Sequence, residues 1–82
     1  MDLRSARKKQ GWTLEHVGRL IGGVAPTTVA RHEKGSRYPG PDEIERYLAI
    51  YAGDVTEDDI RKTHRDWRKR SSPPAQKEPT HA

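Results

Sequence analysis

The sequence predicts an all-α fold: a compact domain of four to five short helices over residues 1–70, followed by a disordered C-terminal tail. Apolar side chains recur three and four residues apart, which is the spacing of a helix with one buried face. Glycine and proline interrupt this pattern repeatedly and divide it into short segments. No segment shows the alternation of a strand, and because only 30% of the residues are hydrophobic, the core must be small.

The composition excludes several classes of site. The chain has no cysteine, so disulfides, cysteine-based zinc sites and thiol nucleophiles are ruled out. The four histidines do not pair at zinc-ligand spacing, and we expect no metal and no cofactor. No apolar run approaches the ~20 residues that span a bilayer, so we expect a soluble, cytoplasmic protein without a membrane partner.

The charge is unevenly distributed along the chain. Residues 1–37 hold eight basic and three acidic residues, residues 38–60 hold one and seven, and residues 61–70 hold six and one. Two basic blocks therefore flank an acidic one. Such segregation indicates a surface that faces a polyanion and an opposite, solvated surface.

Two helices are predicted before residue 24. Asp2 can cap the first, which runs to about Gln10, because its side chain accepts hydrogen bonds from free N–H groups at a helix start. Thr13 can cap the second, and Gly22-Gly23 end it. The side chains expected on their buried faces are Leu3, Ala6, Val17, Leu20 and Ile21.

A third helix is predicted over residues 26–34. Pro26 suits the first helical position, where its missing N–H would be unpaired in any case, and Gly35 suits the left-handed residue after the last turn. Residues 13–35 thus predict two short helices joined by a tight turn that contains glycine. This is the form of a helix-turn-helix unit, whose second helix lies in the major groove of DNA.

Two further helices complete the predicted domain. Pro41 or Asp42 begins the fourth, whose apolar face is expected to hold Ile44, Tyr47, Leu48 and Tyr51. Thr56 caps a fifth over about 57–70, with acidic residues at its start and basic residues at its end, as the helix dipole favours. Residues 71–82 begin with Ser71-Ser72-Pro73-Pro74 and are expected to be disordered.

Several residues stand at positions typical of one family. They are Arg7, Gly11, Trp12-Thr13, Gly18, Gly22, Val29, Glu33-Lys34-Gly35 and Pro39. Through them the chain resembles the lambda-repressor-like, Cro/CI-type (XRE) helix-turn-helix proteins, over roughly residues 3–53. Residues 44–60 look more loosely like small phage Cro-type and antitoxin-like regulators. The resemblance implies a DNA-binding domain of the lambda-repressor-like type.

Three positions depart from the family pattern. The turn has one residue more than usual, with Gly22-Gly23-Val24 between the two helices. Leu14 stands where the family often has a glutamine that touches phosphate. Ala25 stands where Ser or Thr usually caps the recognition helix, which weakens the cap by about 1 kcal/mol.

The third helix supplies the candidates for reading DNA bases. Because Val29 faces the core, we expect Thr27, Thr28 and Arg31 to face outward, and Arg31 can donate two parallel hydrogen bonds to guanine. Ordinary exposed helix surface is the alternative interpretation. His32 either reads bases at the groove edge or fills a slot where the family often has a buried apolar residue.

Residues around this helix are candidates for phosphate contact. They are Arg19, Lys34, Ser36 and Arg37. For Lys34, Ser36 and Arg37 the alternative interpretation is a solvated loop without a role in binding. The resemblance further implies a structural ion pair between Arg7 and Glu33, which would join the first helix to the end of the third.

The fifth helix allows three interpretations. Ile60, His64 and Trp67 share one face of it. Trp67 can pack on the first or fourth helix and complete the core, form a dimer contact, or leave the helix as a basic arm along DNA.

These observations predict a sequence-specific DNA-binding transcriptional regulator, a repressor that inserts helix 26–34 into the major groove of double-stranded DNA as a homodimer. An antitoxin-like or phage accessory protein, whose main partner is another protein, is the alternative. A second alternative is an architectural protein that binds DNA without sequence preference. An enzyme with a small-molecule substrate is disfavoured, because the carboxylates stand at helix starts, where capping explains them.

Overall fold

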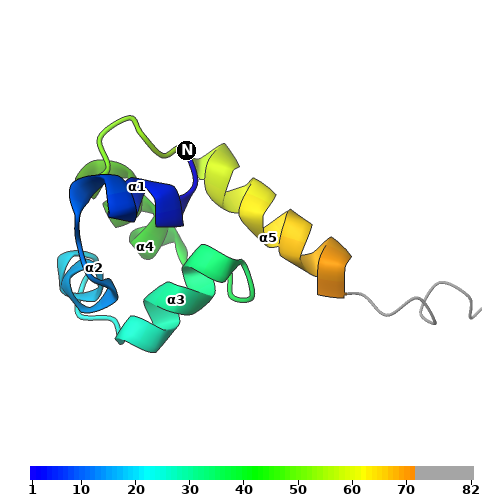
Figure 1. Ribbon diagram of the computed structural model, residues 1–82, viewed down its shortest axis with the longest axis horizontal. Helices are drawn as coiled ribbons and strands as arrows, with labels where there is room; N and C mark the ends of the chain where they lie inside the picture. Colours follow the sequence, from blue (N-terminus) through cyan, green and yellow to red (C-terminus); the bar gives the residue numbers. More distant parts are fainter. Residues whose placement is uncertain (72–82) are drawn as a thin grey trace, which may run out of the picture.

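The structure, a computed structural model, describes residues 1–71. Within them it contains five helices and no strand: α1 Leu3–Gln10, α2 Leu14–Leu20, α3 Pro26–Lys34, α4 Pro41–Ile50 and α5 Glu57–Ser71 (Figure 1). The predicted all-α fold is confirmed. Helix α5 includes Ser71, where the tail was expected to begin, and the rest of the predicted tail, residues 72–82, lies outside the described residues.

Short polar side chains begin three of these helices. The carboxylate of Asp2 accepts the N–H of Ser5 at 2.9 Å, and the hydroxyl of Thr13 accepts the N–H of His16 at 3.1 Å. Thr56 and Asp59 cap each other reciprocally at the start of α5. Helix α3 differs, because Ala25 at its N-cap makes no side-chain hydrogen bond.

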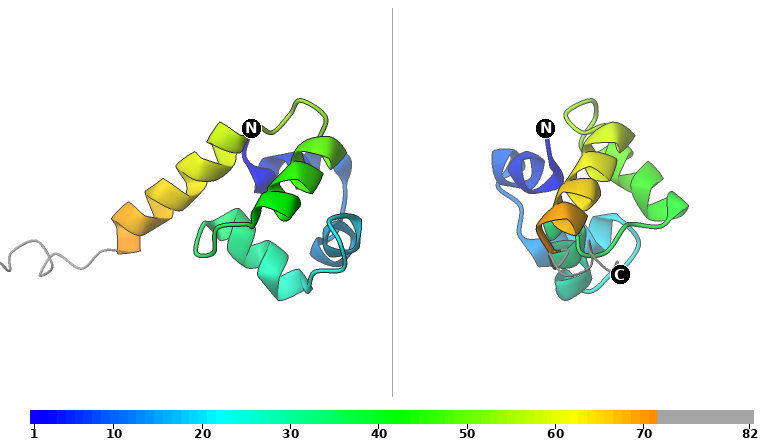
Figure 2. Two further views of the ribbon diagram at one scale, coloured as in Figure 1. Left: turned by 180° about the vertical axis from the view of Figure 1, so that it is seen from behind. Right: turned by 90° about the vertical axis from the view of Figure 1, so that its right-hand side faces the viewer.

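The core is shared by the helices and the segment before α5. Its buried apolar residues are Leu3, Ala6, Val17, Ile21, Val29, Ile44, Tyr47, Tyr51, Val55 and Ile60. Helix α3 contacts α2, α5 and α1 and is therefore held from several sides. Helix α5 begins beside the N-terminus and extends away from the other four helices (Figure 2).

One predicted core residue is on the surface. Leu20 was expected beside Val17 and Ile21, but it is 39% exposed, whereas those two are buried. Helix α2 ends at Leu20, and Ile21, four residues after Val17, fills the inward position. Trp12, Leu14 and Val24 are partly buried and also pack against the core.

The turn between α2 and α3 depends on two glycines. A Cβ on Gly18 would collide with the carbonyl group of Val24, so only glycine lets the chain pass this close to α2. Gly22 has φ of +114°, and a Cβ there would overlap the guanidinium of Arg46 from α4. That guanidinium donates a hydrogen bond to the carbonyl oxygen of Ile21 at 3.3 Å.

Helix α5 docks on the residue that ends α3. Gly35 has φ of +96°, and a Cβ there would lie 2.5 Å from the carbonyl oxygen of Thr63 and 3.0 Å from Cβ of Trp67. His64 Nδ1 donates to the carbonyl oxygen of Gly35 at 2.7 Å. Trp67 therefore lies against the end of α3. This differs from packing on the first or fourth helix, which was one of the three interpretations of the sequence, and the dimer contact stays a prediction.

Candidate nucleic-acid interface

Helix α3 has one buried and one exposed face. Val29 is fully buried, while Thr27 and Arg31 are exposed and Thr28 is partly buried at the edge. Thr27, Arg31 and Lys34 are spaced four and three residues apart, so they share the outward face. This face offers a hydroxyl, a guanidinium and an ammonium group to a ligand.

His32 belongs to the opposite face, so the interpretation that it fills a buried slot is confirmed and its candidate role in base reading is wrong. The residue is only 1% exposed, and its Nδ1 is hydrogen-bonded to the hydroxyl of Tyr47 at 2.8 Å. It lies three residues after Val29 and therefore points into the same core. Burial lowers the pKa of His32, which keeps the imidazole neutral.

The candidates for phosphate contact fall into two places. Lys34, Ser36 and Arg37 follow one another at the end of α3, with Lys34 and Arg37 exposed and Ser36 partly buried. Arg19 lies in the last turn of α2, exposed and 3.9 Å from the carboxylate of Glu15. Such a weak pair between exposed groups leaves the guanidinium of Arg19 available to an anion.

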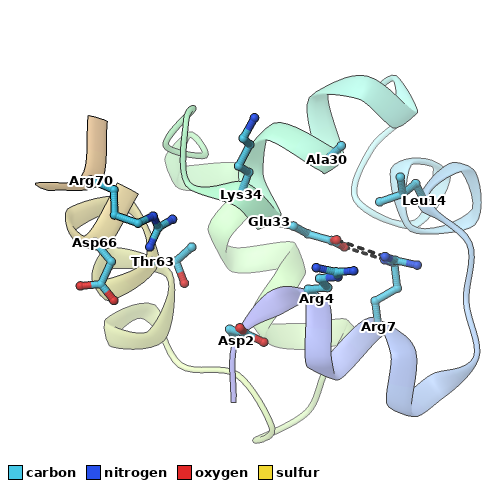
Figure 3. Close-up of a pocket in the computed structure, with 10 residues that line it drawn as sticks. All are labelled: Asp2, Arg4, Arg7, Leu14, Ala30, Glu33, Lys34, Thr63, Asp66 and Arg70. Carbon is cyan, nitrogen blue, oxygen red and sulfur yellow. Dashed lines mark hydrogen bonds and ion pairs between the residues drawn. The ribbon is translucent and has the colours of Figure 1, made fainter. Parts of the chain in front are cut away.

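A two-point ion pair holds α3 against α1. Arg7 Nε lies 2.7 Å from Glu33 Oε2, and Arg7 Nη2 lies 3.2 Å from Glu33 Oε1 (Figure 3). Arg7 also donates to the carbonyl oxygen of Trp12 at 3.1 Å, where the chain enters α2. Glu33 raises the pKa of Arg7 through this hydrogen bond. One guanidinium thus connects α1, α3 and the segment that leads into α2.

A groove beside α3 was not predicted. Arg4 from α1 and Arg70 from α5 line it together with Lys34 (Figure 3). Arg4 and Arg70 are far apart in the sequence and come together because α5 docks on Gly35. No local pattern could have indicated this proximity.

The described residues, 1–71, contain no group of three His, Asp or Glu side chains placed to hold a metal ion. Over the same residues, no helix is long and apolar enough to cross a membrane.

Comparison with known families adds one finding. A family model described as "Helix-turn-helix domain" matches residues 2–59, which include α1 to α4 and the start of α5. Neither the curated proteins nor the solved structures compared with the chain gave a significant match.

Proposed function

The chain belongs to the helix-turn-helix domain family, a DNA-binding class, and on this premise we propose that it is a sequence-specific transcriptional repressor of the lambda-repressor-like, Cro/CI type. The observation that carries the proposal is the two-faced α3. Its outward face presents Thr27 and Arg31, and its inward face is fixed by Val29 and by the Arg7–Glu33 pair. A helix held this rigidly and exposed on one side is suited to enter a major groove.

Each residue of the outward face has a role that follows from its chemistry. Arg31 donates two hydrogen bonds to O6 and N7 of a guanine, a geometry that no other base offers. Thr27 and Thr28 contribute a hydroxyl for a base edge or phosphate and a methyl group for thymine. The phosphate strands on either side are contacted by Arg19, Lys34, Ser36 and Arg37.

The functional unit is proposed to be a homodimer. A single α3 reaches only a few base pairs, which supplies little discrimination among the many sites of a genome. Two copies on half-sites about 34 Å apart, one helical turn, double the number of bases read. Occupancy of such a site beside a promoter excludes other proteins from it, which is the simplest mode of repression.

The test is selection of bound sequences from a random duplex library. The wild-type chain is expected to enrich a motif with two related halves, and Arg31→Ala to lose preference for guanine at one position of each half. Arg61→Ala, which removes the same side chain from the start of α5, is the control and should enrich the wild-type motif. An unchanged motif with Arg31→Ala would exclude direct reading by this helix. Absence of any enriched motif would favour the interaction-protein alternative.

A further inference from the structure

An open groove runs beside α3, between α1 and α5, with Leu14 of α2 at one end (Figure 3). Its volume is about 640 Å³. A water molecule occupies about 30 Å³ of liquid, so the groove is far larger than a single hydrated ion requires. An extended ligand fits it better than a point charge.

The acidic groups that line this groove are already engaged. Asp2 accepts the N–H of Ser5, and Glu33 is paired with Arg7. Asp66 lies 3.5 Å from Lys62, one turn earlier on α5. Only Glu33 is offset by a basic residue of the groove itself, and the lining as a whole holds four basic residues against three acidic ones.

Three cations remain at the rim. Arg4, Lys34 and Arg70 are all exposed, and within residues 1–71 none of the three makes an ion pair or side-chain hydrogen bond. They come from α1, α3 and α5, and Figure 3 shows them around the same opening. Three separated positive charges along one groove match a ligand that carries several negative charges in a row.

We propose that this groove binds the sugar-phosphate backbone of one DNA strand beside the bases that α3 reads, with Arg4, Lys34 and Arg70 each contacting a phosphate. The inference rests on the proposed function and extends it to two helices outside the helix-turn-helix unit. Lys34 carries the argument, because it belongs both to the outward face with Arg31 and to the rim of the groove. A strand that flanks the base-reading face must therefore pass the groove.

The packing of α5 keeps Arg70 in this position. Gly35 admits Thr63 and Trp67 so closely that α5 is seated on the last turn of α3. The hydrogen bond from His64 to the same glycine adds a directional contact. The base-reading helix and α5 are thus joined at Gly35 before DNA is bound, and this preorganisation reduces the entropy lost on binding.

The first experiment measures binding of the full chain to a duplex carrying its selected motif, over a series of salt concentrations. Arg4→Gln and Arg70→Gln are each expected to lower the slope of log K against log salt by about one unit, because one phosphate contact is lost. The same loss raises Kd on the order of tenfold at about 0.1 M salt. Neither variant should change which motif is selected, since phosphate contacts carry no base information.

The matched control is Arg65→Gln. Arg65 is an exposed arginine of the same helix that does not line the groove, so its removal changes the net charge equally. It is expected to keep the wild-type slope. Equal slopes for Arg65→Gln and Arg70→Gln would overturn the inference, although a retained motif would leave the proposed function intact.

A second experiment locates α5 on the DNA. The chain has no cysteine, so Ser71→Cys provides one site for an iron chelate that cuts nearby backbone. Cuts are expected on one strand at the flank of each half-site. Arg61→Cys carries the same reagent at the opposite end of α5 and should give none there. Absence of cuts from position 71, or an identical pattern from position 61, would also overturn the inference.

Discussion

His32 Nδ1 and the hydroxyl of Tyr47 lie 2.8 Å apart, and solvent reaches neither residue. This pair joins the back of α3 to α4, directly beneath the face that presents Arg31. The second ring nitrogen of His32 is buried without a hydrogen-bond partner, and the nearest carboxylate oxygen, from Glu43, lies 3.6 Å away. A buried polar group with an unpaired atom reduces stability, but the bond to Tyr47 fixes how α3 sits on α4.

Burial of His32 predicts a loss of stability in mild acid. Its folded-state pKa lies below the ordinary 6.5, so the unfolded chain takes up a proton that the folded chain resists. The stability that neutral, buried His32 contributes is fully present above pH 6.5. It is lost as the pH falls from there through the folded-state pKa. Urea unfolding at about pH 7.5 and about pH 5 should show a smaller free energy of unfolding at the lower pH. His32→Gln should remove most of this difference, and His16→Gln should retain it.

The Arg7–Glu33 pair is predicted to be a strong contributor to stability. Their side chains are only 16% and 7% exposed, so Arg7→Met leaves a nearly buried carboxylate without its partner. The expected loss is about 3 kcal/mol of the free energy of unfolding, and Arg7→Met with Glu33→Met should recover part of it. Lys9, 56% exposed and 3.0 Å from Asp54, is the control, and Lys9→Met should cost under about 1 kcal/mol. Equal losses for the two single variants would contradict the prediction.

Gly35 should tolerate no side chain. Gly35→Ala places a Cβ against Thr63 and Trp67 and adds the strain of a left-handed residue, about 1–2 kcal/mol by itself. Gly11 has a similar φ of +75°, but a Cβ there meets nothing within 4 Å, so Gly11→Ala should show the strain alone. Thermal unfolding measures the melting temperatures of both variants. The extra decrease in Gly35→Ala over Gly11→Ala measures how much the docking of α5 contributes to stability. Similar melting temperatures would show that this docking contributes little.

The start of α3 can be improved. Ala25 has the extended backbone of an N-cap but no side chain to accept a hydrogen bond, so Ala25→Ser should stabilise the chain by about 1 kcal/mol. Thr13→Ala removes the working cap of α2 and should destabilise by a similar amount. Chemical denaturation gives the free energy of unfolding of each variant, which should rise for Ala25→Ser and fall for Thr13→Ala. A neutral or destabilising Ala25→Ser would mean that its hydroxyl cannot reach the free N–H groups.

Local chemistry made the helices predictable from the sequence. Asp2 and Thr13 accept hydrogen bonds at helix starts, and Gly11 and Gly35 are left-handed at helix ends, as their residue types require. The choice of Thr27 and Arg31 as outward residues followed from the helical period once Val29 was assigned to the core. Each of these inferences uses residues within about one turn of one another.

The remaining features depend on contacts between distant segments. The burial of His32 requires Tyr47, fifteen residues later, to offer a hydroxyl at the right place. Leu20 is exposed at the last residue of α2 while Ile21 is buried, and helical spacing alone does not distinguish these two positions. The groove that brings Arg4 to Arg70 exists only after α5 has docked. Helical periodicity identifies a face but not the element that covers it.

The guanidinium of Arg46 occupies the space that a side chain at position 22 would need, and from there it supports the carbonyl of Ile21. Positions 22 and 46, which are 24 residues apart in the sequence, therefore share one space. A side chain at position 22 would displace this guanidinium from the carbonyl of Ile21, and it would also carry the strain of a φ of +114°.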